Sequence, residues 1–86
     1  MQAQDMLSDA ADVAQVNGAV VRKGTVGAFL ANARCLMASA ASETENALAR
    51  QHIIEALPAL QALGVFEVFA LRDPAVRAFV DDALTR

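Results

Sequence analysis

The apolar residues of this chain recur at three- and four-residue intervals, which is the spacing of one face of an α-helix. The clearest case is the segment 25–41, placed on a helix at about 100° per residue. Its large apolar residues then share one face, and small or neutral residues form the other. The large face carries Val26, Phe29, Leu30, Ala33, Leu36, Met37 and Ala40, and the thin face carries Ala28, Ala31, Asn32, Cys35, Ala38 and Ser39. This pattern predicts a helix whose large face turns to a core and whose thin face lets another helix approach closely.

The preceding segment, residues 3–17, also shows helical spacing between Met6 and Val13. The pair Asn17 and Gly18 follows it, and both residues tolerate the left-handed conformation that ends helices. We therefore expect a first helix over residues 3–17 that stops at this pair.

Residues 18–24 are bracketed by glycines, which oppose a long helix and predict a connector. Within it, residues 19–21 are expected either as a short extended segment or as one helical turn. Arg22 and Lys23 come just before Thr25, which is expected to cap the N-terminus of the next helix. A helix N-terminus beside two cations is a candidate anion site, made of Arg22, Lys23 and Thr25.

A helix boundary is predicted after Ala41. Ser42 and Glu45 have the spacing of a capping box, in which each side chain accepts a hydrogen bond from the other residue's backbone amide. One helix is therefore expected to end near residue 41 and another to start at residue 42 or 43. A single long helix through both segments is the alternative, because no strong breaker separates them.

The helix that starts near Glu43 is expected to run to Gly64, with a broad apolar stripe from Ile53 to Leu63. Pro58 lies inside this pattern. Proline removes a backbone donor and clashes with the preceding turn, so Pro58 is expected either to kink the helix or to end it and start another.

Residues 65–72 are the most hydrophobic part of the chain, and a run this short fits a buried helix or a strand. A strand here has residues 19–23 as its only candidate partner, so we favour a helix that is buried in the core or in an interface between subunits. Asp73 and Pro74 then form a clear helix start, which predicts a last helix over residues 74–85.

Composition supports helices over a sheet. Alanine, the best intrinsic helix former, accounts for 20 of the 86 residues, and the chain has no Tyr or Trp. We therefore predict an all-α fold: one domain over residues 1–86, built as a compact bundle of four to five short helices. The alternative is an α+β fold in which residues 19–23 pair with residues 65–70 as two strands. A chain this short and this rich in alanine buries little area per residue, which favours completion of the core by self-association.

Charge and cysteine content narrow the cellular context. The net charge is −3, with ten acidic and seven basic residues, so no basic face for nucleic acid is expected. The single cysteine fits a reducing compartment. The first twelve residues have no basic start or long apolar run, and no segment reaches the length of a membrane span. We expect a cytoplasmic protein without a membrane segment.

Catalytic and metal-binding patterns are weak. His52, the only imidazole, lies three residues before Glu55, but further ligands for a metal are not apparent. Cys35 and His52 form a nucleophile and base only in principle, since no acid or oxyanion donor accompanies them. No enzymatic activity and no cofactor are expected.

Two functions fit this pattern. The first is a small non-enzymatic interaction or regulatory module that self-associates as a homodimer, with a further protein partner possible. Its candidate interface residues are Ala28, Ala31, Cys35, Ala38, Val65, Phe66 and Phe69. The second is a small-molecule or anion-binding protein that uses the helix N-terminus at Thr25, together with Arg22 and Lys23.

Overall fold

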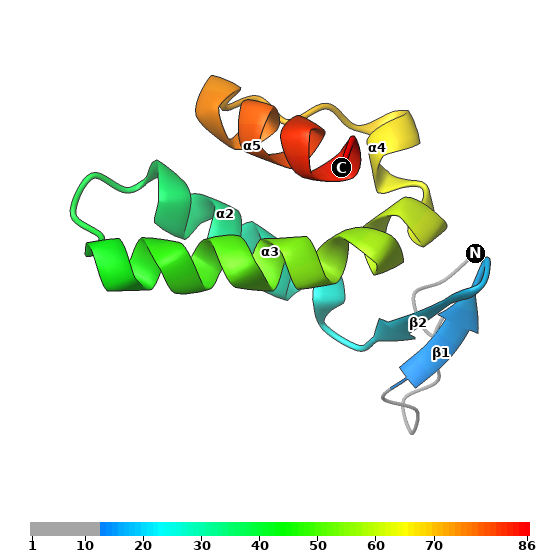
Figure 1. Ribbon diagram of the computed structural model, residues 1–86. Coiled ribbons are helices and arrows are strands. Elements are labelled where there is room, and N and C mark those ends of the chain that lie inside the picture. Colours follow the sequence, from blue (N-terminus) through cyan, green and yellow to red (C-terminus); the bar gives the residue numbers. More distant parts are fainter. Residues whose placement is uncertain (1–12) are drawn as a thin grey trace.

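The computed structural model describes residues 13–86, which form two short strands and four helices (Figure 1). In chain order these are β1 (Val13–Val16), β2 (Ala19–Arg22), α2 (Thr25–Met37), α3 (Glu43–Leu63), α4 (Val65–Val68) and α5 (Pro74–Leu84). The fold is mostly helical, but its two-stranded sheet makes it α+β, so the all-α prediction is corrected. Of the helix predicted over residues 3–17, residues 3–12 lie outside the described part, and residues 13–16 form β1 instead.

The two strands form an antiparallel hairpin closed by a two-residue loop, Asn17 and Gly18. Both loop residues have positive φ angles, 46° and 85°. This is the backbone that a tight hairpin turn requires, and Asn-Gly is the sequence that adopts it most readily. The pair therefore turns a hairpin here and does not stop a helix. The predicted pairing of residues 19–23 with residues 65–70 is also wrong, because β2 pairs with β1.

One face of the hairpin packs towards the helices. Residues alternate along both strands, and Val21 is the most deeply buried of them. The turn is held at the end of α3, where the Asn17 side-chain amide donates a hydrogen bond of 2.7 Å to the carbonyl oxygen of Ala62. An isolated two-stranded hairpin is marginal in water, so its contact with α3 is what stabilises it.

The boundary between α2 and α3 is confirmed in part. α2 ends at Met37, about four residues before the predicted end near residue 41, because Ala38 adopts an extended backbone. Ser42 then caps α3: the Glu45 amide donates to Ser42 Oγ at 3.1 Å, and the Ser42 amide donates to Glu45 Oε1 at 3.4 Å. The alternative of one long helix is therefore wrong, and the capping box is confirmed.

Pro58 lies inside α3, which continues through it to Leu63. Gly64, with φ 83°, ends α3 and at once begins α4. The predicted helix over residues 65–72 is confirmed for its first four residues only, since the backbone is extended from Phe69. α5 begins as predicted: the Val76 amide donates to Asp73 Oδ2 at 2.9 Å, with Pro74 in the first turn.

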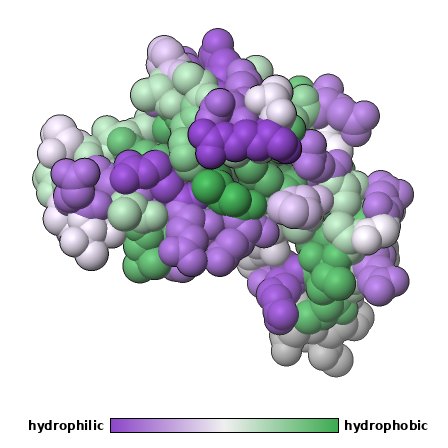
Figure 2. All heavy atoms as spheres, viewed as in Figure 1, coloured by the Kyte–Doolittle hydropathy of each residue, from purple (hydrophilic) through white to green (hydrophobic). Residues whose placement is uncertain are grey.

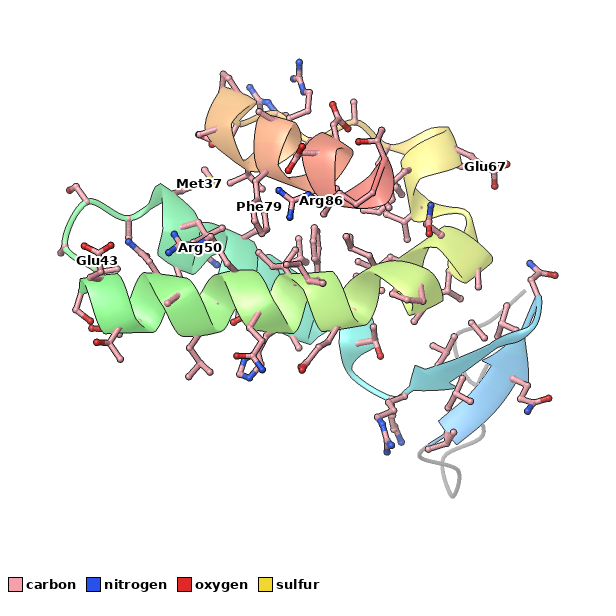
Figure 3. All side chains as sticks on the ribbon, viewed as in Figure 1. Met37, Glu43, Arg50, Glu67, Phe79 and Arg86 are labelled. Atoms are coloured by element: carbon pink, nitrogen blue, oxygen red, sulfur yellow. The ribbon has the colours of Figure 1, made fainter. Side chains whose placement is uncertain are left out.

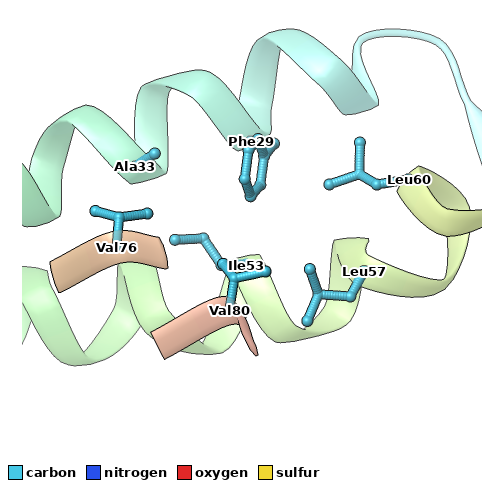
Figure 4. Close-up of a cluster of buried hydrophobic side chains, with 7 residues drawn as sticks. All are labelled: Phe29, Ala33, Ile53, Leu57, Leu60, Val76 and Val80. Atoms are coloured by element: carbon cyan, nitrogen blue, oxygen red, sulfur yellow. The ribbon is translucent and has the colours of Figure 1, made fainter. Parts of the chain in front are cut away.

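The core lies between α2, α3 and α5 (Figure 4). α5 lies along one side of the α2–α3 pair, and the hairpin lies near the end of α3 (Figure 1). The seven buried residues of the core cluster are Phe29, Ala33, Ile53, Leu57, Leu60, Val76 and Val80. Phe66 of α4 closes the cluster on one side, with its ring 6.1 Å from that of Phe29 in an edge-to-face arrangement.

Phe29 is predicted to be the most costly side chain to remove, because it is the only aromatic residue in the buried cluster. Phe29→Ala should lower the free energy of unfolding by about 3–5 kcal/mol. Phe29→Leu, which keeps most of the volume, should fall well below that loss. Leu48→Ala, at an exposed helical leucine, should change the free energy by no more than about 0.5 kcal/mol. Urea denaturation measures all three, and equal losses at positions 29 and 48 would contradict this core.

Candidate functional site

The exposed side of α2 carries three large apolar residues. Of its predicted large face, Val26, Leu30 and Met37 are exposed, at 43%, 55% and 57%. The expectation that these three face the core is therefore wrong. The buried direction of α2 is centred on Phe29 and Ala33, and the apolar arc of the helix is wider than the elements packed against it.

The predicted thin face of α2 is divided between solvent and α3. Ala28, Ala31 and Ala38 are exposed, whereas Cys35 is half-buried. The Cys35 sulfur lies 3.9 Å from the carbonyl oxygen of Glu45 and 3.8 Å from Asn46 Oδ1, both in the first turn of α3. On the thin face, Cys35 therefore contacts α3, and the three alanines are exposed to solvent.

The remaining candidate interface residues, in and just after α4, differ in burial. Val65 and Phe66 are half-buried and pack against the core cluster. Val68 and Phe69 are largely exposed, at 76% and 69%, and Phe69 also borders a hollow of about 180 Å³ beside α5. We call residues 67–69 the α4 tip.

An apolar groove of about 150 Å³ runs between α2 and the segment that leads into α5. We call it the α2 groove. Its lining residues are Phe29, Leu30, Ala33, Arg34, Met37, Leu71, Arg72, Asp73 and Val76. The exposed residues Leu30 and Met37 form one wall, so the apolar surface of α2 continues into a concave site. Such a groove suits an apolar side chain from a second protein molecule.

A larger hollow of about 340 Å³ lies between β2, α2 and α3. Its lining residues are Val20, Arg22, Thr25, Ala28, Phe29, Asn32, His52, Glu55, Ala56 and Ala59. The structure therefore places two of the three predicted anion-site residues, Arg22 and Thr25, in one site. Lys23 is exposed and does not line the hollow.

Thr25 does not cap α2 as predicted. Gly24 is the N-cap, with φ 87°, and its left-handed backbone makes the turn from β2 into the helix. Thr25 is the first helical residue, and its hydroxyl donates a hydrogen bond of 2.7 Å to the carbonyl oxygen of Arg22. The first turn of α2 thus has neither a side-chain cap nor an acidic residue.

The weak catalytic and metal patterns are only partly assembled. His52 and Glu55 line the same hollow, and Glu55 accepts a hydrogen bond of 3.4 Å from Gln51 Nε2. Cys35 does not line it. Among residues 13–86, no three His, Cys, Asp or Glu side chains are grouped as metal ligands would be.

The hairpin also exposes apolar side chains. Val13 and Val20 are 44% and 54% exposed, although Val20 also lines the hollow, and Figure 2 shows an apolar patch over the hairpin beside a largely hydrophilic α3 surface. No helix in the described part of the chain has the length and apolar character to cross a membrane. Comparisons with protein-family models, curated proteins and solved structures found no match.

The position of Cys35 against the first turn of α3 allows a comparison of variants within α2. Cys35→Leu adds volume against the first turn of α3 and should lower the free energy of unfolding by about 1–3 kcal/mol. Cys35→Ser should be milder, because the site already lies beside two oxygen atoms. Ala31→Leu is the control at an exposed position of the same helix and should be near neutral. Thermal unfolding of the three variants provides the test, and a harmless Cys35→Leu would contradict this packing.

Proposed function

We propose that this protein is a small, non-enzymatic interaction module that acts by self-association as a homodimer. The observation that carries the proposal is the apolar surface formed by Val26, Leu30 and Met37 around the α2 groove. Contiguous exposed apolar surface beside a concave site marks interaction surfaces in small domains. The α4 tip adds two further exposed apolar side chains, Val68 and Phe69, that such a contact could bury.

The size of the core also supports association. The described residues include ten buried apolar residues, and three of them are alanines, which contribute one methyl group each. A core of this size supplies limited stability to a short chain. Burial of the α2 surface against a second molecule would remove further apolar area from water and stabilise the fold through linkage.

The remaining parts of the proposal rest on composition. The single cysteine supports a reducing compartment, and we place the module in the cytoplasm. The excess of acidic over basic residues supports a protein partner in preference to a nucleic acid.

The first test compares two leucines with similar exposed fractions, of which only one lines the α2 groove. Leu30, at the α2 groove, is 55% exposed, and Leu48, on α3, is 52% exposed. Leu30→Glu should convert a dimer to a monomer, because it places a charge in the apolar contact, and Leu48→Glu should leave the dimer intact. Sedimentation velocity over a range of micromolar concentrations measures the association, and circular dichroism confirms that both variants stay folded. A wild-type protein that remains monomeric throughout would refute the proposal.

A second candidate function is the binding of a small anionic molecule in the hollow between β2, α2 and α3. The observation in its favour is that Arg22 and Thr25 share this hollow with Asn32 and His52. Mixed apolar and polar lining is typical of small-molecule sites, and backbone amides at a helix start attract anions.

A thermal-shift screen with phosphate, pyrophosphate and phosphorylated metabolites tests this second function. A ligand at about 100 times its dissociation constant should add about 2.7 kcal/mol to the free energy of unfolding. Arg22→Gln should abolish the shift, whereas Arg34→Gln, at an exposed position of α2 outside the hollow, should not. Lack of any shift, or an equal loss in both variants, would argue against an anion site here.

A further inference from the structure

The α4 tip joins an acid to the two most exposed large apolar side chains of the described chain. Val68 and Phe69 are 76% and 69% exposed, and Glu67 directly precedes them. Glu67 projects from α4 away from the body of the molecule, as Figure 3 shows. Within residues 13–86, its carboxylate has no hydrogen bond or ion pair. The tip is therefore an apolar projection with a negative charge beside it.

The α2 groove has the opposite character. Its walls are apolar, and two exposed arginines, Arg34 and Arg72, are among its lining residues. Neither guanidinium has a hydrogen-bond or ion-pair partner within the described part of the chain. Asp73 also lines the groove, where its carboxylate accepts the Val76 amide as the cap of α5 and offsets part of the positive charge. The two arginines outnumber this one acidic residue, so the groove is an apolar hole with a net positive lining.

Tip and groove lie close together in the chain but do not fill one another. Leu71 lines the groove, and Phe69 precedes it by two residues on an extended backbone. Phe69 nevertheless keeps most of its surface exposed and does not line the α2 groove of its own chain. A projection and a complementary hole on one chain can close into a two-fold symmetric dimer, in which each copy gives and receives the same contact.

We infer that the occupant of the α2 groove is the α4 tip of a second copy of this chain. In this dimer, Phe69 and Val68 of one copy enter the groove of the other, and Glu67 meets the partner's arginines. The contact occurs twice, related by the two-fold axis. This inference rests on the proposed self-association and specifies its geometry. Opposite charges around an apolar centre fix the register of such a contact and disfavour other arrangements.

A charge exchange tests the inference with two variants. Glu67→Arg places a positive charge opposite the arginines of the groove. The double variant Arg34→Glu with Arg72→Glu places negative charges opposite Glu67. Each variant alone should dimerise at least about tenfold more weakly than the wild type, because both copies of the contact become repulsive. An equimolar mixture of the two should recover a dimer, since both contacts in the mixed pair are again between opposite charges.

Net charge alone predicts a different result, which makes the Glu67→Arg variant diagnostic. That substitution changes the net charge by two, from −3 to −1, and should ease general repulsion between copies. Glu43→Arg is the matched control, because it makes the same change of charge at an exposed position of α3 outside both the α2 groove and the hollow beside the hairpin. Glu43→Arg should dimerise as well as the wild type or better, whereas Glu67→Arg should dimerise less well.

A separate variant, Phe69→Ser, tests the apolar part of the contact between tip and groove. Phe69→Ser should weaken the dimer without unfolding the monomer, because this ring is largely exposed in one chain. Sedimentation equilibrium measures dissociation constants for every variant, and the mixture is examined with one component fluorescently labelled.

The outcomes separate this geometry from the self-association on which it rests. Weakening by Glu67→Arg and Phe69→Ser, with recovery in the mixture, establishes the contact of tip and groove. If Leu30→Glu breaks the dimer but Glu67→Arg and Phe69→Ser do not, or if the mixture stays monomeric, the geometry is overturned while self-association stands. If the wild type is monomeric throughout, both are overturned.

Discussion

The apolar stripe of α3 is the constraint on which the other described elements depend. α2, α4, α5 and both strands of the hairpin contact this one helix. Ile53 and Leu60 on its inner face are fully buried, and the Asn17 amide binds near its C-terminal end. The buried residues of α3 lie on both sides of Pro58, and the helix continues through this proline to Leu63. One continuous helix therefore carries both the core and the contact with the hairpin turn.

Sequence pattern was sufficient where a local interaction decides the structure. The capping box at Ser42, the Asp73 and Pro74 start of α5 and the stop at Gly64 depend on neighbours within a few residues, and all three are present. The hairpin was missed because Asn17 and Gly18 favour a left-handed backbone that either ends a helix or turns a two-residue loop. Strands of four residues are too short for their alternation to outweigh a helical pattern.

The surface of α2 shows why burial was harder to foresee than helix formation. Its apolar residues cover a wide arc, and periodicity alone does not say which part of that arc the rest of the chain covers. Phe29 and Ala33 are buried in the core, whereas Leu30 and Met37 are exposed to solvent. Likewise, Arg22 and Thr25 were identifiable as neighbours in sequence. That they line the same hollow as His52 depends on how the hairpin lies against α2 and α3, which no local sequence pattern encodes.

The ring of Phe29 has a consequence beyond its share of the core. It lines both the α2 groove and the hollow beside the hairpin, so the two concavities have one wall in common. It also meets the ring of Phe66, directly before the α4 tip. A substitution at Phe29 therefore alters a wall of the groove and a wall of the hollow at once. The functions of the two concavities are separable only by changes at residues that line one of them and not the other.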